Sequence, residues 1–225
     1  SEKKHYHGHR YRLRHRFQEH GITSLQEYEV VELLLTYLIP QKDVKPLAKR
    51  LLENVGSLKN LIETSPQKLA QISGIKEHSA LFFSLLHSII ELYQEQKITE
   101  KPAITGPSDV YPYLQTCLGS KDKEHFMVIF LNSQNQIIGN EILHEGTINQ
   151  SMVYPRTVIE KVLHYQATAI IIAHNHPSGS LRPSTDDRTI TQSLQKALSH
   201  IDVVIHDHII ITRNGCISFK DLGIL

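Results

Sequence analysis

The stretch Ala169–Gly179 reads Ala-Ile-Ile-Ile-Ala-His-Asn-His-Pro-Ser-Gly and decides how the second half of the chain folds. Its apolar run predicts a buried β-strand that ends at the histidines. Because alternate side chains of an extended backbone share one face, His174 and His176 are expected to point the same way. Two imidazoles placed like this can bind a single metal ion.

Strand-like and helical segments alternate on both sides of this stretch. The β-rich runs are 126–131, 137–143, 169–173 and 203–212, and the helical stretches lie near 108–118, 155–166 and 184–200. Such alternation is typical of a layered α/β domain. Residues 97–107 are polar, contain two prolines and a glycine, and lack periodicity, which predicts a connection between independently packed units.

Residues 1–100 predict a different architecture. Apolar residues recur at helical spacing from Arg10 to Tyr93, and breakers interrupt the pattern at Gly21, Pro40, Gly56, Pro66 and Gly74. We expect about four or five short helices joined by tight turns and packed as a bundle. The predicted fold class is therefore a two-domain α+β protein, with an all-helical domain at 1–100, a linker at 101–107 and a layered α/β domain at 108–225.

Composition narrows the class of protein. Of the 225 residues, 40% are hydrophobic and 21% are charged, and no apolar run is long enough to cross a bilayer, which argues against membrane insertion. The 2 cysteines are too few for a disulfide framework and the first residues do not resemble a signal peptide, so a cytoplasmic location is expected. The net charge of +1 gives no general attraction to nucleic acid, although residues 1–16 form a small basic arm. The 15 histidines are the feature that needs an explanation.

Oxygen-bearing side chains follow the histidine pair at a fixed spacing. Seven residues separate His176 from Ser184, and Asp187 comes three positions later, where a helix is expected to begin. Two imidazoles and one carboxylate suit zinc and leave a fourth position for water, which favours catalysis over a structural role. Ser184 and Asp187 also fit a helix capping box, and the histidines alone fit a structural or solvent-facing role. Capping and metal binding are compatible, since a helix N-terminus favours an ionised carboxylate.

The combined pattern resembles a known family. His174-x-His176, seven residues, Ser184, two residues and Asp187 is similar to the JAMM/MPN metalloprotease signature, and the flanking residues resemble its bacterial RadC branch. Further segments that look like RadC are Gly8–Leu13, Glu29–Leu35, Asp43–Ala48, Gly146-Thr147, Pro155-Arg156 and Asp207–Ile210. The resemblance implies a zinc-dependent hydrolase in which activated water attacks a peptide or isopeptide bond, and the RadC name suggests DNA repair. Asn175 departs from the commoner MPN pattern, which often has serine or threonine there; asparagine is normal for RadC, and it suggests a different substrate channel.

The resemblance also implies a role for each site residue. The implied zinc ligands are His174, His176 and Asp187. Ser184 is the implied hydrogen-bond donor to the oxyanion of a tetrahedral intermediate. The signature further requires a glutamate base on an early strand of the domain, and Glu124 best matches that location. Glu141 and Glu145 stay as alternatives.

A second pair of histidines, His206 and His208, flanks Asp207 in a strand-like run. No oxygen ligand follows at matching spacing, so a second metal site is not favoured, and we expect Asp207 or His208 to support the first site. A nucleobase deaminase is excluded, because it needs a histidine and glutamate motif together with a cysteine pair that this sequence lacks.

The helical half offers a candidate nucleic-acid contact. Leu69–Ala80 resembles a helix-hairpin-helix, in which backbone amides of a glycine-containing turn meet a phosphate. Gly74 supplies that glycine, while Lys76 stands where a second glycine is usual. With Arg10 and Arg12 of the basic arm, these residues are the expected DNA contacts. The alternative function is a DNA-binding accessory protein, or a nuclease that cleaves phosphodiesters at the same metal site; the other expected partner is an unidentified protein substrate.

Overall fold

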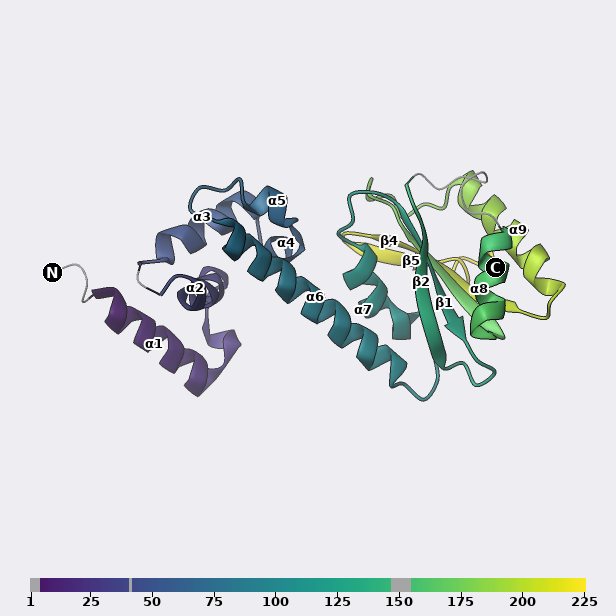
Figure 1. The fold of residues 1–225 in the computed structure, drawn as a ribbon, viewed down its shortest axis with the longest axis horizontal. Coiled ribbons are helices and arrows are strands. Elements are labelled where there is room, and N and C mark those ends of the chain that lie inside the picture. Colours follow the sequence, from purple (N-terminus) through teal and green to yellow (C-terminus); the bar gives the residue numbers. More distant parts are fainter. Residues whose placement is uncertain (1–4, 41, 147–154) are drawn as a thin grey trace. The chain divides into compact units, whose positions relative to one another are not determined.

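The computed structural model describes residues 5–40, 42–146 and 155–225 (Figure 1). The chain divides into two compact units, one up to Ile89 and the other from Ile90 onward. The first unit is helical and the second is a layered α/β structure, which confirms the predicted fold class. Within the described residues, no helix is both long enough and apolar enough to cross a bilayer.

The helical unit is built from short helices joined by tight turns. They are α1 (His5–His20), the 3-10 helix η2 (Ile22–Ser24), α2 (Glu27–Leu38), α3 (Lys45–Val55), α4 (Leu58–Glu63), α5 (Pro66–Leu69) and the first part of α6 (Glu77–Thr99). Apolar residues at helical spacing form the core, including Val31 and Leu35 of α2 and Leu51 of α3. Side-chain caps mark the helix starts, as where the Ser57 hydroxyl accepts a hydrogen bond from the Asn60 amide at 3.1 Å. The described part of this unit contains more helices than the sequence predicts.

The α/β unit contains one mixed sheet. Its elements are α7 (Pro107–Leu118), β1 (His125–Leu131), β2 (Ile137–Glu145), α8 (Pro155–Tyr165), β3 (Ala169–Asn175), α9 (Thr185–Ser199), β4 (Val204–Thr212) and β5 (Gly215–Ser218). The strand order is β2-β1-β3-β4-β5. Only β3 and β4 pair in parallel among these strands, and α9 is the crossover that connects them. The four predicted strand runs are confirmed, and β5 is an addition that the sequence did not reveal.

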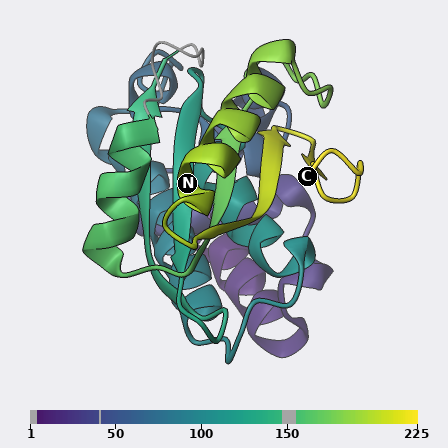
Figure 2. The ribbon, with the colours of Figure 1, turned by 90° about the vertical axis from the view of Figure 1, so that its right-hand side faces the viewer.

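Helices cover both faces of the sheet (Figures 1 and 2). On one face, α8 and α9 pack on alternate residues of the strands, such as Val128 and Ile170. On the other face, α7 packs on the intervening residues, such as Ile129 and Ile171. Both faces of β3 are therefore buried, which explains why its sequence is continuously apolar rather than alternating.

The segment that the sequence assigns to a linker, 101–107, packs against the α/β unit. Ile98 and Ile104 are buried in the core beneath α7. The Lys101 ammonium also forms an ion pair with the carboxylate of Asp109. The change from one compact unit to the next lies earlier, inside α6 between Ile89 and Ile90. A polar, proline-containing composition predicts the absence of regular structure. It does not show against which of the two units the few apolar residues of the segment pack.

Candidate metal centre

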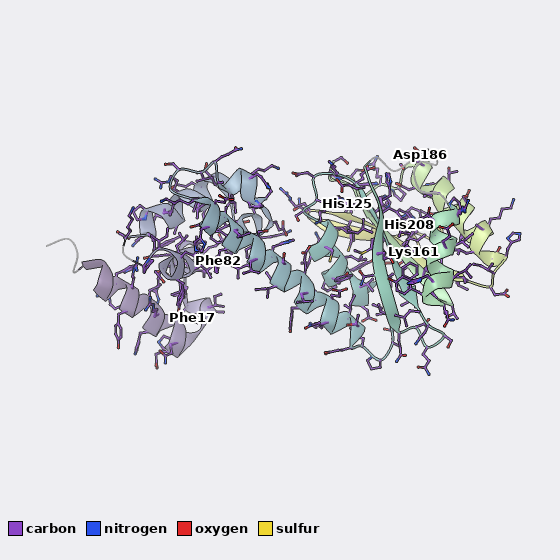
Figure 3. The ribbon with its side chains drawn as sticks, viewed as in Figure 1. Phe17, Phe82, His125, Lys161, Asp186 and His208 are labelled. Carbon is purple, nitrogen blue, oxygen red and sulfur yellow. The ribbon has the colours of Figure 1, made fainter. Side chains whose placement is uncertain are left out.

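The site forms where the end of β3 meets the start of α9. His174 is fully buried near the end of β3, and His176 follows the strand directly with its side chain 11% exposed. The chain then forms a loop and enters α9, whose third residue is Asp187. Since a crossover helix must return along the sheet to start the parallel strand β4, its first turn lies beside the carboxyl end of β3. Figure 3 shows the neighbouring residue Asp186 at the start of this helix.

Potential ligand atoms of three residues converge on one point. The Nε2 atom of His174 lies 2.9 Å from Nε2 of His176 and 3.1 Å from Oδ1 of Asp187. Nε2 of His176 lies 3.4 Å from Oδ2 of Asp187. Ligands about 2.0–2.1 Å from a tetrahedral zinc ion are about 3.3 Å from one another, so these separations fit zinc after small adjustments. Among the described residues, this is the one cluster of three or more potential ligands that could hold a metal ion.

Asp187 has two tasks, because it both caps α9 and faces the histidines. The Ser184 hydroxyl accepts a hydrogen bond from the Asp187 amide at 3.0 Å, and the Asp187 carboxylate accepts one from the Ser184 amide at 2.7 Å. Both interpretations of this motif made from the sequence, the capping box and the convergence on the histidines, hold together in the structure. Burial raises the pKa of Asp187, but hydrogen bonds from His174, His176 and the Ser184 amide outweigh it and hold the pKa well below its usual range. The carboxylate is therefore ionised and ready to bind a cation.

A chain of hydrogen bonds fixes the tautomer of His174. The Thr191 hydroxyl lies 2.6 Å from the Asp187 carbonyl oxygen, which can only accept, so the hydroxyl donates there and its oxygen accepts from Nδ1–H of His208 at 2.6 Å. Burial lowers the pKa of His208 well below its usual value, so its ring is neutral and Nε2 is an acceptor. That atom accepts from Nδ1–H of His174 at 2.8 Å. Nε2 of His174 therefore faces the site, where it donates to Asp187 while it carries a proton and offers its lone pair when a cation replaces that proton.

A backbone carbonyl group orients His176 so that its Nε2 atom, like that of His174, faces the site. Its Nδ1 atom lies 2.7 Å from the carbonyl oxygen of Ser180, which can only accept, so Nδ1 carries a proton. The hydrogen bond with Asp187 raises the pKa of His176, so a proton and a metal ion compete for the same Nε2 atom. The donor set, the orientation of both rings and the ionised carboxylate all fit a divalent ion that prefers nitrogen and oxygen ligands.

The second histidine pair does not form another metal site. His206 contacts the Asn135 side chain through Nε2 at 2.8 Å and lines a pocket with Asn135 and Asp207 that includes none of the three cluster residues. Asp207 is buried and accepts hydrogen bonds from the Ser218 hydroxyl at 2.6 Å and the His208 amide at 2.8 Å, which stabilises the packing of β5 on β4. His208 alone of this trio contacts the candidate ligands, through His174, and Figure 3 shows it within the α/β unit.

An open pocket of about 340 Å³ lies over the cluster. Glu124 and Ser184 line it together with His176 and Asp187. Glu124 is half-buried and directly precedes β1, and its charge acts on the imidazole of His176. The pocket therefore contains both residues that the family resemblance assigns to catalysis.

The two alternative bases lie outside this pocket. The Glu141 carboxylate accepts a hydrogen bond from the Tyr165 hydroxyl at 2.9 Å and pairs with the Lys161 ammonium at 2.6 Å. Glu145 pairs with the Lys123 ammonium at 2.8 Å. These partners lower the pKa of both carboxyl groups, chiefly through the hydrogen bond from the lysine in each case. Glu124 is thus the candidate that the geometry favours.

The expected nucleic-acid contacts are only partly available at the surface. Arg10 is buried, and its guanidinium donates hydrogen bonds to the carbonyl oxygens of Ile39, at 2.9 Å, and of Pro40 and Lys42. These groups follow the end of α2, so Arg10 stabilises a helix terminus and is not placed to contact phosphate. Arg12 is exposed.

The segment that resembles a helix-hairpin-helix consists of the short helix α5, a turn at Gly74 and the start of α6. Gly74 has φ +95° between α5 and α6, and a side chain there would approach the Arg50 guanidinium to 2.9 Å. Lys76 is exposed just before α6 begins. Since α5 spans only Pro66–Leu69, the first helix of this motif is a single turn.

Two participants in the site were not singled out from the sequence. Thr191 carried no signal apart from its position four residues after Asp187 on a helix, which places both residues on one face. The Ser180 carbonyl is a backbone group, so residue identity could not indicate it.

Comparison with known proteins covers most of the chain. Residues 104–224 match the RadC-like JAB domain model, and residues 8–81 match the UPF0758 N-terminal model. A UPF0758 protein of Fusobacterium nucleatum subsp. nucleatum is 38% identical over 225 residues, which covers 97% of this chain and 97% of that protein. The candidate metal cluster and both candidate catalytic residues lie within the matched RadC-like segment.

Proposed function

Because the chain belongs to the RadC family, we propose that it is a zinc-dependent hydrolase that cleaves a peptide or isopeptide bond. The observation that carries this proposal is the convergence of His174, His176 and Asp187, with Nε2 of His174 directed to the common point by a hydrogen-bond chain. Two nitrogen ligands and one oxygen ligand leave a fourth tetrahedral position for water, which is typical of catalytic rather than structural zinc.

Zinc in this cluster would supply Lewis-acid activation of water and of the substrate carbonyl. Glu124 is positioned in the pocket to accept the proton of the attacking water and later to donate it to the leaving amine. Ser184 accepts the Asp187 amide hydrogen bond with its oxygen, which leaves its own proton for the developing oxyanion. Neither residue forms a covalent bond to the substrate in this mechanism.

The test compares Glu124→Gln with Glu141→Gln and Glu145→Gln. Each purified protein is assayed for bound zinc and for turnover on panels of peptide, isopeptide-linked and nucleic-acid substrates. We expect Glu124→Gln to keep zinc and to lose turnover by about 10²-fold or more, since a general base contributes about that much. The two control variants should retain turnover. Zinc-free wild-type protein after growth with zinc, or full turnover by Glu124→Gln, would contradict the proposal.

A second proposal, nucleic-acid binding with a link to DNA repair, rests on the exposed face of α1. Tyr11 and Arg12 line an open pocket of about 320 Å³ with His15 and His20. Tyr11 is 69% exposed, so its ring is available to stack on a base while Arg12 attracts phosphate. We expect binding to single-stranded DNA to weaken with salt, and Arg12→Ala and Lys76→Ala each to reduce the salt slope by about one. A titration at low salt that shows no binding would remove this proposal.

A further inference from the structure

Asn175 lies between the two histidine ligands, but its side chain points to the opposite face of β3. In a strand, the residue between two that share a face points the other way. Asn175 is 1% exposed and is not among the residues that line the pocket over the cluster. Asn175 therefore does not line this pocket, so the structure gives no support to the expectation that it marks a different substrate channel, and its role is inferred from what the amide contacts.

The Asn175 amide binds the backbone on both sides of Glu124. Its Oδ1 atom accepts a hydrogen bond from the His125 amide at 2.7 Å. Its Nδ2 atom donates to the carbonyl oxygens of Lys123 at 2.9 Å and of Lys121 at 3.2 Å. One buried side chain thus binds three backbone groups of the segment 121–125, and both hydrogens of its amide are used.

The pairing of β1 with β3 brings this segment to the metal cluster. Phe126 lies opposite His174 in the antiparallel ladder, so continuing that register by two residues sets Glu124 opposite His176. The carbonyl oxygen of Glu124 accepts a hydrogen bond from the Gly146 amide at 2.8 Å, which fixes the segment from its other edge. The backbone that carries Glu124 is therefore held between Asn175 and Gly146.

The chemistry of the three contacts selects asparagine. The site needs one acceptor and two donors at the end of a two-carbon side chain. Aspartate would keep the acceptor for His125 but would set a carboxylate oxygen against two carbonyl oxygens. Serine has one proton and a shorter reach, so it could not bind both carbonyl groups.

We propose that Asn175 is a positioning residue that holds Glu124 over the metal cluster. The same strand, β3, then carries the histidine ligands on one face and, on its other face, the side chain that positions the general base. This inference rests on the proposed function only for the chemical role of Glu124. The geometric part, control of the segment 121–125 by a single side chain, is independent of which reaction the site performs.

The test uses Asn175→Ala and Asn175→Asp. We expect amide hydrogen exchange in residues 121–126 to become about tenfold faster, as local opening becomes easier, while zinc affinity stays within about twofold of wild type. On a cleaved substrate, kcat should fall and KM should stay unchanged. Combined with Glu124→Gln, the Asn175 substitutions should cause no further loss, because they act through the same residue.

Asn132→Ala is a matched control. Asn132 follows β1 at the opposite end of the strand and also makes three side-chain hydrogen bonds, to the amides of Gln134 and Gln136 and to the Gln136 side chain. It should leave exchange in 121–126 and kcat unchanged. Unaltered exchange in both Asn175 variants, or a loss of zinc affinity that matches the loss of kcat, would overturn the proposal. If Glu124→Gln alone retains turnover, the proposed base is wrong, whereas accelerated exchange in 121–126 would still support the geometric role.

Discussion

Thr191→Val removes one hydroxyl group from the hydrogen-bond chain behind the candidate metal ligands and changes little else. Valine has nearly the same size as threonine, so no cavity is left in the packing of α9, and the consequence comes from the lost hydroxyl. The Asp187 carbonyl keeps its position in the helix. The Nδ1–H group of His208 loses its acceptor, however, in surroundings that exclude solvent completely.

The magnitude follows from that buried group. Leaving a buried donor without a partner costs about 1–3 kcal/mol of unfolding free energy. The His208 ring can also turn or change tautomer, and then Nε2 no longer accepts from His174. Loss of such support around a ligand typically weakens metal binding about 10- to 100-fold.

Two measurements check this prediction. Zinc affinity is measured by competition with a chromophoric chelator, and unfolding free energy by urea denaturation of metal-free protein. Thr189→Val is the control, because the Thr189 hydroxyl makes the same kind of bond, to the Thr185 carbonyl at 2.8 Å, on the exposed side of the same helix. Wild-type zinc affinity in Thr191→Val, or an equal loss in Thr189→Val, would refute the reasoning.

Two further predictions concern stability away from the cluster. Asp109→Asn should lower the unfolding free energy by about 1–3 kcal/mol at pH 7, because hydrogen bonds from the Lys101 ammonium and the Thr105 amide hold the pKa of Asp109 well below its usual range. A carboxyl group with a lowered folded pKa stabilises the protein above its unfolded pKa, so the difference between wild type and variant should shrink as the pH falls below about 4; a constant difference in urea denaturation would count against the pair. Arg10→Met should destabilise the helical unit by about 2–4 kcal/mol, since three carbonyl groups lose a charged donor, whereas Arg12→Ala should change the unfolding free energy by less than about 0.5 kcal/mol. Equal thermal shifts for the two arginine variants would contradict this assignment.

The convergence of His174, His176 and Asp187 was predictable because two local rules act on nearby residues. Strand periodicity places His174 and His176 on one face, and the capping signal places Asp187 in the first turn of a helix. A crossover between parallel strands then brings the two ends together. Spacing along 14 residues, from 174 to 187, thus carried most of the information about the ligands.

Side-chain contacts that depend on tertiary packing were harder to predict from the sequence. The expectation that Asp207 or His208 supports the site left two residues open, and only the packing of β4 beside β3 shows that His208 contacts His174. Arg10 looked like one more cation of a basic arm, because its sequence neighbours are basic and nothing local reveals a buried helix terminus beside it. Glu124 was chosen over Glu141 and Glu145 by its place before a strand, and distinguishing them required the positions of Lys161 and Lys123.

The double task of Asp187 affects how related sequences should be compared. The hydrogen bonds between Ser184 and Asp187 stabilise the first turn of α9 whether or not an ion is bound. A homologue that had lost its histidines would still gain from an acidic residue at this position. Retention of the serine and aspartate is therefore weak grounds for inferring an intact active centre in a diverged relative. Retention of the two histidines is the more informative sign that the chemistry has been preserved.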